Sequence, residues 1–333
     1  MGRQGQGLAE FRIAFFDEID DSLKVTLLFQ LSLSFTATPR VLEELRANDD
    51  RYTPEFGIFA LTERGDVAAG HLLMKISTET AVGRLDVGGV NAVGTHPSFA
   101  RRGAMTAVMN ASHKYFREHG LEHSVLTTSR TLGAMMLYER LGYVELARST
   151  LAMKFPNQPR MSAKSEINIR PYSDEDLSQV DRVFKEAVAG SYGFTHRPNN
   201  FLKARNHTIG LYINPKDKLR VARREGMVSG YAYWESNPHL SVAHEILALD
   251  RSSFHALLAD AEQRNPEGGM LVRCSGLTKL EIGWIKEAGY QGPIESYGRA
   301  IIKSLTGKTD SEKMKALYGV RLGKFRVGLW DNT

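Results

Sequence analysis

Residues 85–143 contain the groups whose types and spacing could do chemistry, and the centre of this stretch is a basic, glycine-containing loop. A strand-like run precedes the loop, a helical pattern starts directly after it, and the loop itself carries Arg101, Arg102 and Gly103. Such a loop suits a phosphate, because unpaired N–H groups and the positive end of the helix dipole both point at the anion. The pattern therefore predicts a phosphate cradle, although short glycine patterns also occur in ordinary turns.

A second stretch, Ala134–Tyr143, begins 32 residues after Arg102. It predicts a short helix that ends at Gly142, a residue type that is favoured just past a helix C-terminus. Tyr138 lies near the end of this helix, where a tyrosine is more often a core residue with a satisfied hydroxyl. Its spacing from Gly142 and the basic loop upstream together favour a functional role.

Taken together, the two stretches resemble the signature motifs of the GNAT N-acetyltransferases. In that family V-x-V-x-P-x-(Y/F)-(Q/R)-x-R-G-x-(G/A) binds the diphosphate of acetyl-CoA, and N-x-x-A-x-x-L-Y-x-x-x-G-(F/Y) supplies a tyrosine beside the CoA sulfur. The positions that match here are Val93, Thr95, Pro97, Phe99, Arg102, Gly103, Ala134, Leu137, Tyr138, Gly142 and Tyr143. The departures are Ala100, Met105 and Thr131.

The resemblance is specific over residues 57–155. Met105, which is larger than the usual Gly or Ala, and the run Gly88–Val93 are most similar to the Eis-like branch of the family. That branch usually carries a third, sterol-carrier-like domain, for which the 28 residues of the tail are too few.

The resemblance also implies roles for individual residues. Acetyl transfer to an amine needs a held thioester, a neutral amine, donors for the oxyanion and a proton for the departing thiolate. Tyr138 would donate that proton. The implied cofactor-binding residues are Val93, Gly94 and Thr95 for the pantetheine arm and the acetyl oxygen, Arg101, Arg102, Gly103, Ala104, Met105 and Thr106 for the diphosphate, and Thr131.

The general base cannot be identified from the sequence. Asn91 occupies the strand position where many family members place a glutamate. Asp86 on the same strand, a water relay and the C-terminal carboxylate of Thr333 stay open as alternatives. The histidines of the first half show no spacing typical of metal ligands, so we predict no metal. Cys274 has no evident base beside it and is interpreted as inert.

The chain of 333 residues is long enough for two domains, and its pattern is repeated. We predict an α/β protein (an α+β mixed sheet) of two fused GNAT-like acyl-CoA acyltransferase domains, the second one degenerate. The predicted parts are a catalytic domain over residues 8–155, a polar linker over 156–165, the degenerate copy over 166–305 and a basic-aromatic tail over 306–333. In the first copy, Gly88 and Gly89 are candidates for a β-bulge.

The second copy has lost the residues that carry the chemistry. Its interval from Gly230 to Tyr290 is 13 residues shorter than the matching interval from Gly70 to Tyr143, and no Arg-Gly loop precedes its central helix. Ile285 takes the place of the tyrosine. We therefore predict that one CoA binds per chain and that the second copy shapes the acceptor site.

Composition limits the remaining possibilities. A net charge of +5, with 24% charged residues, is too mild and too dispersed to predict a nucleic-acid partner. No apolar run reaches the ~18 residues of a membrane span. The start of the chain lacks the apolar core of a signal peptide, and a single cysteine fits a reducing, cytoplasmic location. Homo-oligomerisation stays open.

The sequence thus predicts an acetyl-CoA-dependent N-acetyltransferase that acts by direct attack of a primary amine in a ternary complex. Two alternatives remain: an acyl-CoA-binding regulatory module without turnover, and a transferase that uses another acyl or aminoacyl donor. The acceptor is not readable, so a small amine, an aminoglycoside-like polyamine and a protein lysine all stay open. The aromatic and basic residues of the tail more often indicate a segment that docks on its own protein than one that binds nucleic acid.

Overall fold

The computed structural model describes residues 11–33, 38–131, 133–161, 166–197, 201 and 218–327. We call the part up to residue 161 the first half and the part from residue 166 the second half. The first half contains β1 (Arg12–Phe15), η1 (Phe16–Glu18), α1 (Ser22–Leu33), α2 (Pro39–Asn48), β2 (Tyr52–Leu61), β3 (Val67–Thr80), β4 (Gly83–Thr95), η2 (Pro97–Phe99), α3 (Ala104–Glu118), β5 (His123–Ser129), α4 (Ala134–Arg140) and β6 (Val144–Lys154).

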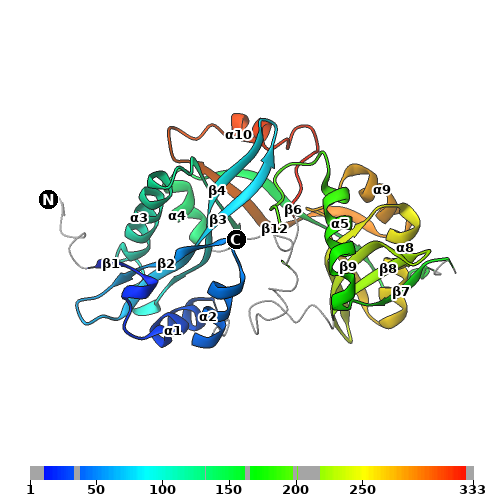
Figure 1. The fold of residues 1–333 in the computed structure, drawn as a ribbon, viewed down its shortest axis with the longest axis horizontal. Helices are drawn as coiled ribbons and strands as arrows, with labels where there is room; N and C mark the ends of the chain where they lie inside the picture. The colour runs from blue at the N-terminus through cyan, green and yellow to red at the C-terminus, as the bar shows by residue number, and fades with distance from the viewer. Residues whose placement is uncertain are drawn as a thin grey trace.

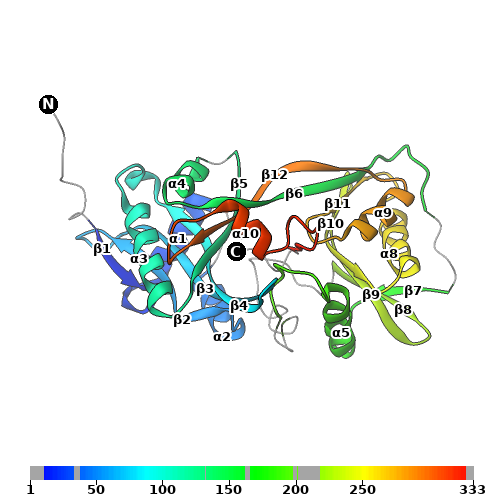
Figure 2. The ribbon, with the colours of Figure 1, turned by 90° about the horizontal axis from the view of Figure 1, so that it is seen from above.

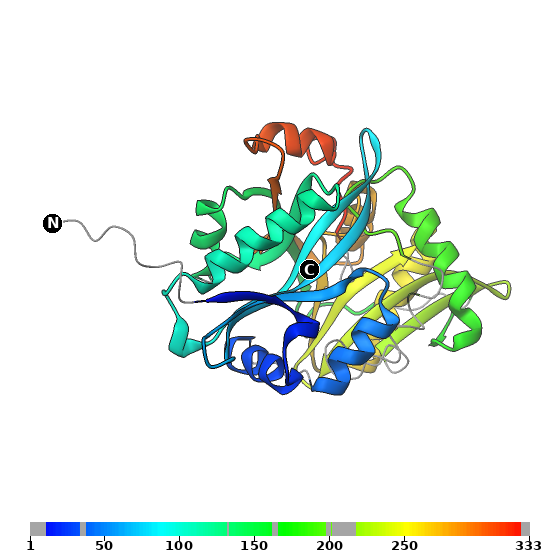
Figure 3. The same ribbon diagram turned by 60° about the vertical axis from the view of Figure 1, so that its left-hand side comes forward.

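The second half follows a similar order, with one described helix between its first two strands and an additional helix at its end. It contains β7 (Asn168–Pro171), η3 (Asp174–Asp176), α5 (Leu177–Val188), β8 (Leu219–Arg224), β9 (Met227–Asn237), β10 (Leu240–Ala248), α8 (Arg251–Arg264), β11 (Gly269–Arg273), α9 (Lys279–Glu287), β12 (Gln291–Ser304) and α10 (Ser311–Leu317). In the first half the helices cover both faces of the sheet, with α1 and α2 on one face and α3 and α4 on the other (Figures 1 and 3).

Local sequence explains where several of these elements begin. Thr38 caps α2 by accepting a hydrogen bond from the backbone N–H of Val41, and Pro39 occupies the first turn, where its missing N–H costs nothing. The bulge expected at Gly88 and Gly89 is not there. Gly88 pairs regularly, and it has no side chain because a Cβ would lie 2.5 Å from the ring of Phe116.

The twelve strands of the described residues form one sheet in the order β1-β2-β3-β4-β5-β12-β6-β11-β10-β9-β8-β7. The halves exchange strands at its centre: β12 of the second half lies between β5 and β6, and β6 of the first half lies between β11 and β12. Both strands are long, and they run side by side from one half into the other (Figure 2). Neither the motifs nor the repeat predicted this exchange.

The exchanged strand β12 contributes to cores on both faces of the sheet. Ile301 belongs to the buried cluster that also holds Met105 and Tyr138, while Ile302 packs with Leu146 on the opposite face. Each isoleucine is at most 1% exposed. Burying each side chain contributes about 1.5–3 kcal/mol. The second half therefore completes the core that holds the candidate catalytic tyrosine.

The described part of the tail lies on the rest of the protein. Phe325 forms a parallel bridge with Tyr192. Arg326 is buried and binds the carboxylate of Glu281 at 2.7 and 2.9 Å. The described part of the tail therefore packs against the protein at the junction between the halves. The start of the chain, discussed above for a signal peptide, and Thr333, a candidate base, lie outside the described residues.

We predict that neither half folds alone. A chain of residues 1–165 lacks β12, so β5 and β6 lose the strand between them along with Ile301 and Ile302. This loss is a large share of a folding free energy of about 5–15 kcal/mol. Residues 1–165 expressed alone should aggregate, and co-expression with residues 166–333 should give a soluble complex with the circular dichroism of the intact chain. A folded, soluble first half that binds acetyl-CoA by itself would contradict the exchange.

Candidate active site

The parallel strands β4 and β5 are paired only where the middle of β4 lies beside the beginning of β5. Gly88 pairs with Ser124 and Gly89 with Val125, and no later pair joins these strands in the described part of the chain. Where they part, Ala92 has a φ of 55°, which is uncommon for a residue with a side chain and marks an irregularity in the strand. The sheet therefore opens beside residues 91–95, which include the predicted positions Val93, Gly94 and Thr95.

The loop after β4 ends at an uncapped helix N-terminus. Gly103 is the N-cap of α3 with a φ of 88°, and it has no side chain that could satisfy the first N–H groups of the helix. The first-turn N–H groups of Ala104, Met105 and Thr106 therefore lack helical partners. A Cβ at Gly103 would meet nothing within 4 Å, so the space before the helix is open. The residue types and this geometry fit a diphosphate.

The other predicted residues of the loop surround this N-terminus. Arg101, with a φ of 65°, and Arg102 are exposed, and the Arg102 guanidinium lies 5.6 Å from the ring centre of Phe99. Ala104 and Met105 are buried in the core, whereas Thr106 is exposed. Thr131 lies beyond β5, and its hydroxyl is 2.8 Å from that of Ser129. The structure thus brings the loop residues together and leaves Thr131 on the neighbouring strand end.

The matching helix of the second half is already capped. Asp250 is the N-cap of α8; its carboxylate accepts a hydrogen bond of 2.9 Å from the N–H of Ser253 and one of 2.8 Å from the Ser253 hydroxyl. Arg224 also binds Asp250 at 3.2 Å. Strand β10 ends at Ala248, two residues before the cap, so no loop intervenes. An anion at this helix would have to displace a carboxylate that is already bound.

Tyr138 and Tyr143 are both buried, but their hydroxyl groups differ. The Tyr143 hydroxyl is 2.6 Å from that of Ser124 and 3.0 Å from Nε2 of His113. The Tyr138 hydroxyl has no hydrogen-bond partner among the described residues. Burial raises the pKa of Tyr138 to about 12, so it holds its proton at neutral pH. Tyr143 is therefore a structural residue, whereas the Tyr138 hydroxyl can donate its proton to a bound ligand.

A chain of hydrogen bonds holds Tyr143 in place, and β12 provides its first donor. Lys303 donates to Nδ1 of His113 over 3.3 Å, so Nε2 of that imidazole carries its proton and donates to the Tyr143 hydroxyl, which then donates to Ser124. Burial, with the nearby Lys303 charge, lowers the pKa of His113 to about 3. The imidazole is consequently neutral, and the chain is a structural support.

The candidates for the general base are poorly placed for that role. Asp86 is bound by Lys75 at 3.0 Å. Although partial burial acts to raise the pKa of Asp86, the bonds from Lys75 and Ser77 bring it below its usual value. Asn91 has no basic group, and Thr333 lies outside the described residues. Within the described ranges no cluster of His, Cys, Asp and Glu could hold a metal ion, and no helix is long and apolar enough to cross a membrane.

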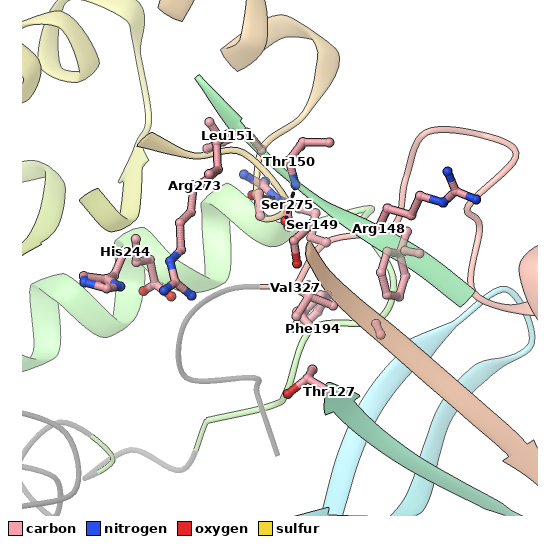
Figure 4. A pocket seen from close by; sticks show the side chains of 18 of the residues that line it. Thr127, Arg148, Ser149, Thr150, Leu151, Phe194, His244, Arg273, Ser275 and Val327 are labelled. Atoms are coloured by element: carbon pink, nitrogen blue, oxygen red, sulfur yellow. Dashed lines mark hydrogen bonds between the residues drawn. The ribbon is translucent and has the colours of Figure 1, made fainter. Parts of the chain in front are cut away.

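A cavity of about 300 Å³ lies at the junction of the halves. Its walls come from β5, β6 and β12, from β10 and the segment after β11, and from α5 and the tail. Figure 4 shows Arg273 and His244 on one side of it and Thr127 of β5 on another. Neither Tyr138 nor the loop before α3 lines this cavity.

Sequence reasoning missed the residues of this cavity. Arg197 binds Glu245 at 2.7 and 2.9 Å, and the Tyr231 hydroxyl donates to the same carboxylate over 2.7 Å. Arg197 and Glu245 are 48 residues apart and follow no motif. No local signal points to these residues, because the strands that form the cavity walls come together only through the pairing of the two halves.

Residues 18–145 match the model of the acetyltransferase (GNAT) domain family. The match runs from η1 into β6 and includes the open strand pair, the uncapped helix and Tyr138. Residues 18–145 of the first half are therefore similar to a GNAT acetyltransferase domain. No curated protein matches the sequence.

Several solved structures share the fold over most of the chain. A GCN5-related N-acetyltransferase from Kribbella flavida is 12% identical, with a TM-score of 0.65 over 90% of this chain and 72% of that one. Eis1 from Mycobacterium abscessus is 15% identical, with a TM-score of 0.59 over 88% and 74% of the two chains. An N-myristoyltransferase from Saccharomyces cerevisiae with bound myristoyl-CoA is 10% identical, with a TM-score of 0.59 over 89% and 79%. The predicted fold class is confirmed, whereas the Eis-like branch stays a prediction.

Gly103→Glu should abolish binding of acetyl-CoA while the fold survives. The new carboxylate would occupy the open space where the first-turn N–H groups point. Losing two charge-assisted hydrogen bonds of about 1.5–3 kcal/mol each weakens affinity at least about 100-fold. Gly120→Glu is the matched control, because Gly120 ends the same helix with a φ of 73° and open surroundings. Calorimetry should show lost affinity in the first variant only; equal affinities would remove the loop from the site.

We also predict one CoA per chain. The carboxylate of Asp250 repels a diphosphate at α8, whereas the helix dipole favours it by only about 0.3–1 kcal/mol. Titration of the intact chain with CoA should give a stoichiometry of one. The Gly103→Glu variant should bind no CoA. Two equivalents bound by the wild type would show that Asp250 does not block the second half.

Proposed function

We propose that the protein transfers the acetyl group of acetyl-CoA to a primary amine by direct attack in a ternary complex. The observation that carries the proposal is the pairing of an uncapped helix N-terminus with an unengaged tyrosine hydroxyl beside an open strand pair. Acetyl-CoA brings an activated thioester. The protein needs to hold it, to stabilise the oxyanion and to protonate the departing thiolate.

Each of these tasks has a candidate group. The N–H groups of residues 103–106 and the guanidinium groups of Arg101 and Arg102 would hold the diphosphate. Backbone groups of Val93 and Thr95, which β5 leaves unpaired, would bind the pantetheine arm and the acetyl oxygen. Tyr138 would give its proton to sulfur. A phenol with a pKa near 12 stays protonated at neutral pH, so its proton is in place to be donated to the sulfur as the carbon–sulfur bond breaks.

The amine acceptor approaches from the face of the sheet opposite α3 and α4. Along β5, Ser124 and Leu126 face these helices, whereas Val125 and Thr127 face the cavities on the other side. Cofactor and acceptor would then meet across the open strand pair without competing for space. This arrangement suits direct attack and needs no acetylated enzyme.

One observation favours a second candidate, an acyl-CoA-binding module without turnover: no described carboxylate beside the opening is placed as a base. Tyr138 argues for the enzyme, because cofactor binding alone does not require a proton donor at sulfur. Release of free thiol from acetyl-CoA in the presence of a panel of amines decides between them. A donor other than acetyl-CoA is tested in the same assay with longer acyl-CoA esters.

Tyr138→Phe should lower kcat by about 10²–10⁴, the usual contribution of one general acid, and leave the affinity for acetyl-CoA near that of the wild type. Steady-state thiol release and calorimetry measure the two quantities. Tyr143→Phe is the control, because that hydroxyl supports the fold. It should cost about 1–3 kcal/mol of stability, by leaving buried partners unsatisfied, with little change in kcat. Equal turnover of Tyr138→Phe and the wild type would exclude Tyr138 as the acid.

A further inference from the structure

The second half has an opening in the sheet that resembles the one between β4 and β5. Strands β10 and β11 are parallel, and in the described part of the chain they pair only over Leu240–Ala243 and Gly269–Val272. The segment after β11 then follows β6 instead, where the N–H of Cys274 donates to the carbonyl oxygen of Thr150 over 2.8 Å. The later residues of β10 and this segment both line the junction cavity. Ligands of α/β sheets commonly bind where neighbouring parallel strands part at their carboxyl ends, so the cavity has the position of a ligand site.

His244 lies directly after the paired part of β10. It is the extra residue of a β-bulge between Ala243 and Glu245, a feature that re-aims a side chain beside a site. Its Nε2 is 3.0 Å from a carboxylate oxygen of Glu235. Burial lowers the pKa of His244, so the imidazole is neutral at pH 7. An ionised carboxylate can only accept, so Nε2 carries the proton and Nδ1 is an acceptor.

This acceptor is left without a donor. Nδ1 of His244 is buried and has no hydrogen-bond partner among the described residues, and the side chain is 10% exposed. A buried acceptor without a donor is costly to the protein. His244 lines the cavity and lies on one side of it (Figure 4). A ligand in the cavity that carries an O–H or N–H group would satisfy Nδ1.

The charged side chains of the lining are already engaged within the protein. Glu245 accepts two hydrogen bonds from Arg197 and one from Tyr231. The other lining arginines interact within the chain as well, namely Arg148, Arg273 and Arg326. A charged ligand would therefore lose its hydration without gaining an unengaged counter-charge. Much of the remaining wall is apolar, with the rings of Phe184, Phe194 and Phe325.

From these observations we propose that the junction cavity is a second ligand site. Its occupant is an uncharged, compact molecule with an aromatic body and one O–H or N–H group that donates to Nδ1 of His244. The proposal goes beyond acetyl transfer and requires no reaction in the second half. An apolar cavity of about 150 Å³ holds benzene, so this cavity of about 300 Å³ has room for two fused rings.

Two probes with the same rings test the proposal: 2-naphthol, which has a hydroxyl donor, and 2-methoxynaphthalene, which has none. Both are uncharged at pH 7. Calorimetry with the full chain should give one 2-naphthol per chain, bound at least about 10-fold more tightly than the methyl ether, because only the hydroxyl satisfies the buried acceptor. In nitrogen-15 spectra of the wild type, 2-naphthol should shift the Nδ1 resonance of His244, and the methyl ether should not.

Two variants of His244 isolate the hydrogen bond. His244→Phe keeps a ring of similar size and removes Nδ1, so it should weaken 2-naphthol about 10-fold and leave the methyl ether nearly unchanged. His244→Asn keeps an acceptor near the position of Nδ1 and should retain the preference for 2-naphthol. Circular dichroism checks that both variants are folded.

Three results would overturn the proposal. They are equal affinities of the wild type for the two probes, a preference for 2-naphthol that survives in His244→Phe, and no binding of either probe at about 1 mM. If His244→Phe does not fold, the spectra of the wild type decide, and an Nδ1 resonance that 2-naphthol leaves unmoved contradicts the site.

Discussion

The exchange of β6 and β12 is the constraint on which the rest of the structure depends. Without β12 the strand β5 has no partner on one side, and the core around Tyr138 loses Ile301. Lys303 on the same strand starts the hydrogen-bond chain that fixes Tyr143. The second half therefore supports the candidate acid of the first from within the sheet. The same exchange brings residues of both halves into the walls of one cavity at the junction.

The two halves share an architecture and differ at a helix N-terminus. A glycine before α3 leaves N–H groups and space for an anion, while an aspartate before α8 satisfies the corresponding groups internally. A side-chain cap of this kind stabilises a helix by about 1 kcal/mol. In the second half the helix end contributes to stability, and in the first half the same position is left available for a ligand. The prediction of one CoA site per chain rests on that one difference.

Much of the first half could be predicted from local signals. Thr38 and Pro39 are residue types typical of a helix start, and the spacing of Arg102, Gly103 and Tyr138 indicated the loop and the helix that carries the tyrosine. The exchange could not be predicted in this way, because strand pairing across more than a hundred residues leaves no local pattern. Gly88 shows the same limit: its type suggested a bulge, but the ring of Phe116, packed from a later helix, is what excludes a side chain there.

The central claim, direct acetyl transfer from CoA to an amine, is tested most directly with acetyl-CoA labelled in the acetyl group. In a single turnover with a primary amine acceptor, mass spectrometry should find the label on the acceptor nitrogen and free CoA in equal amount. The mass of the intact protein should stay unchanged throughout. Label that accumulates on the protein before it reaches the amine, or that appears only as acetate, would contradict the account.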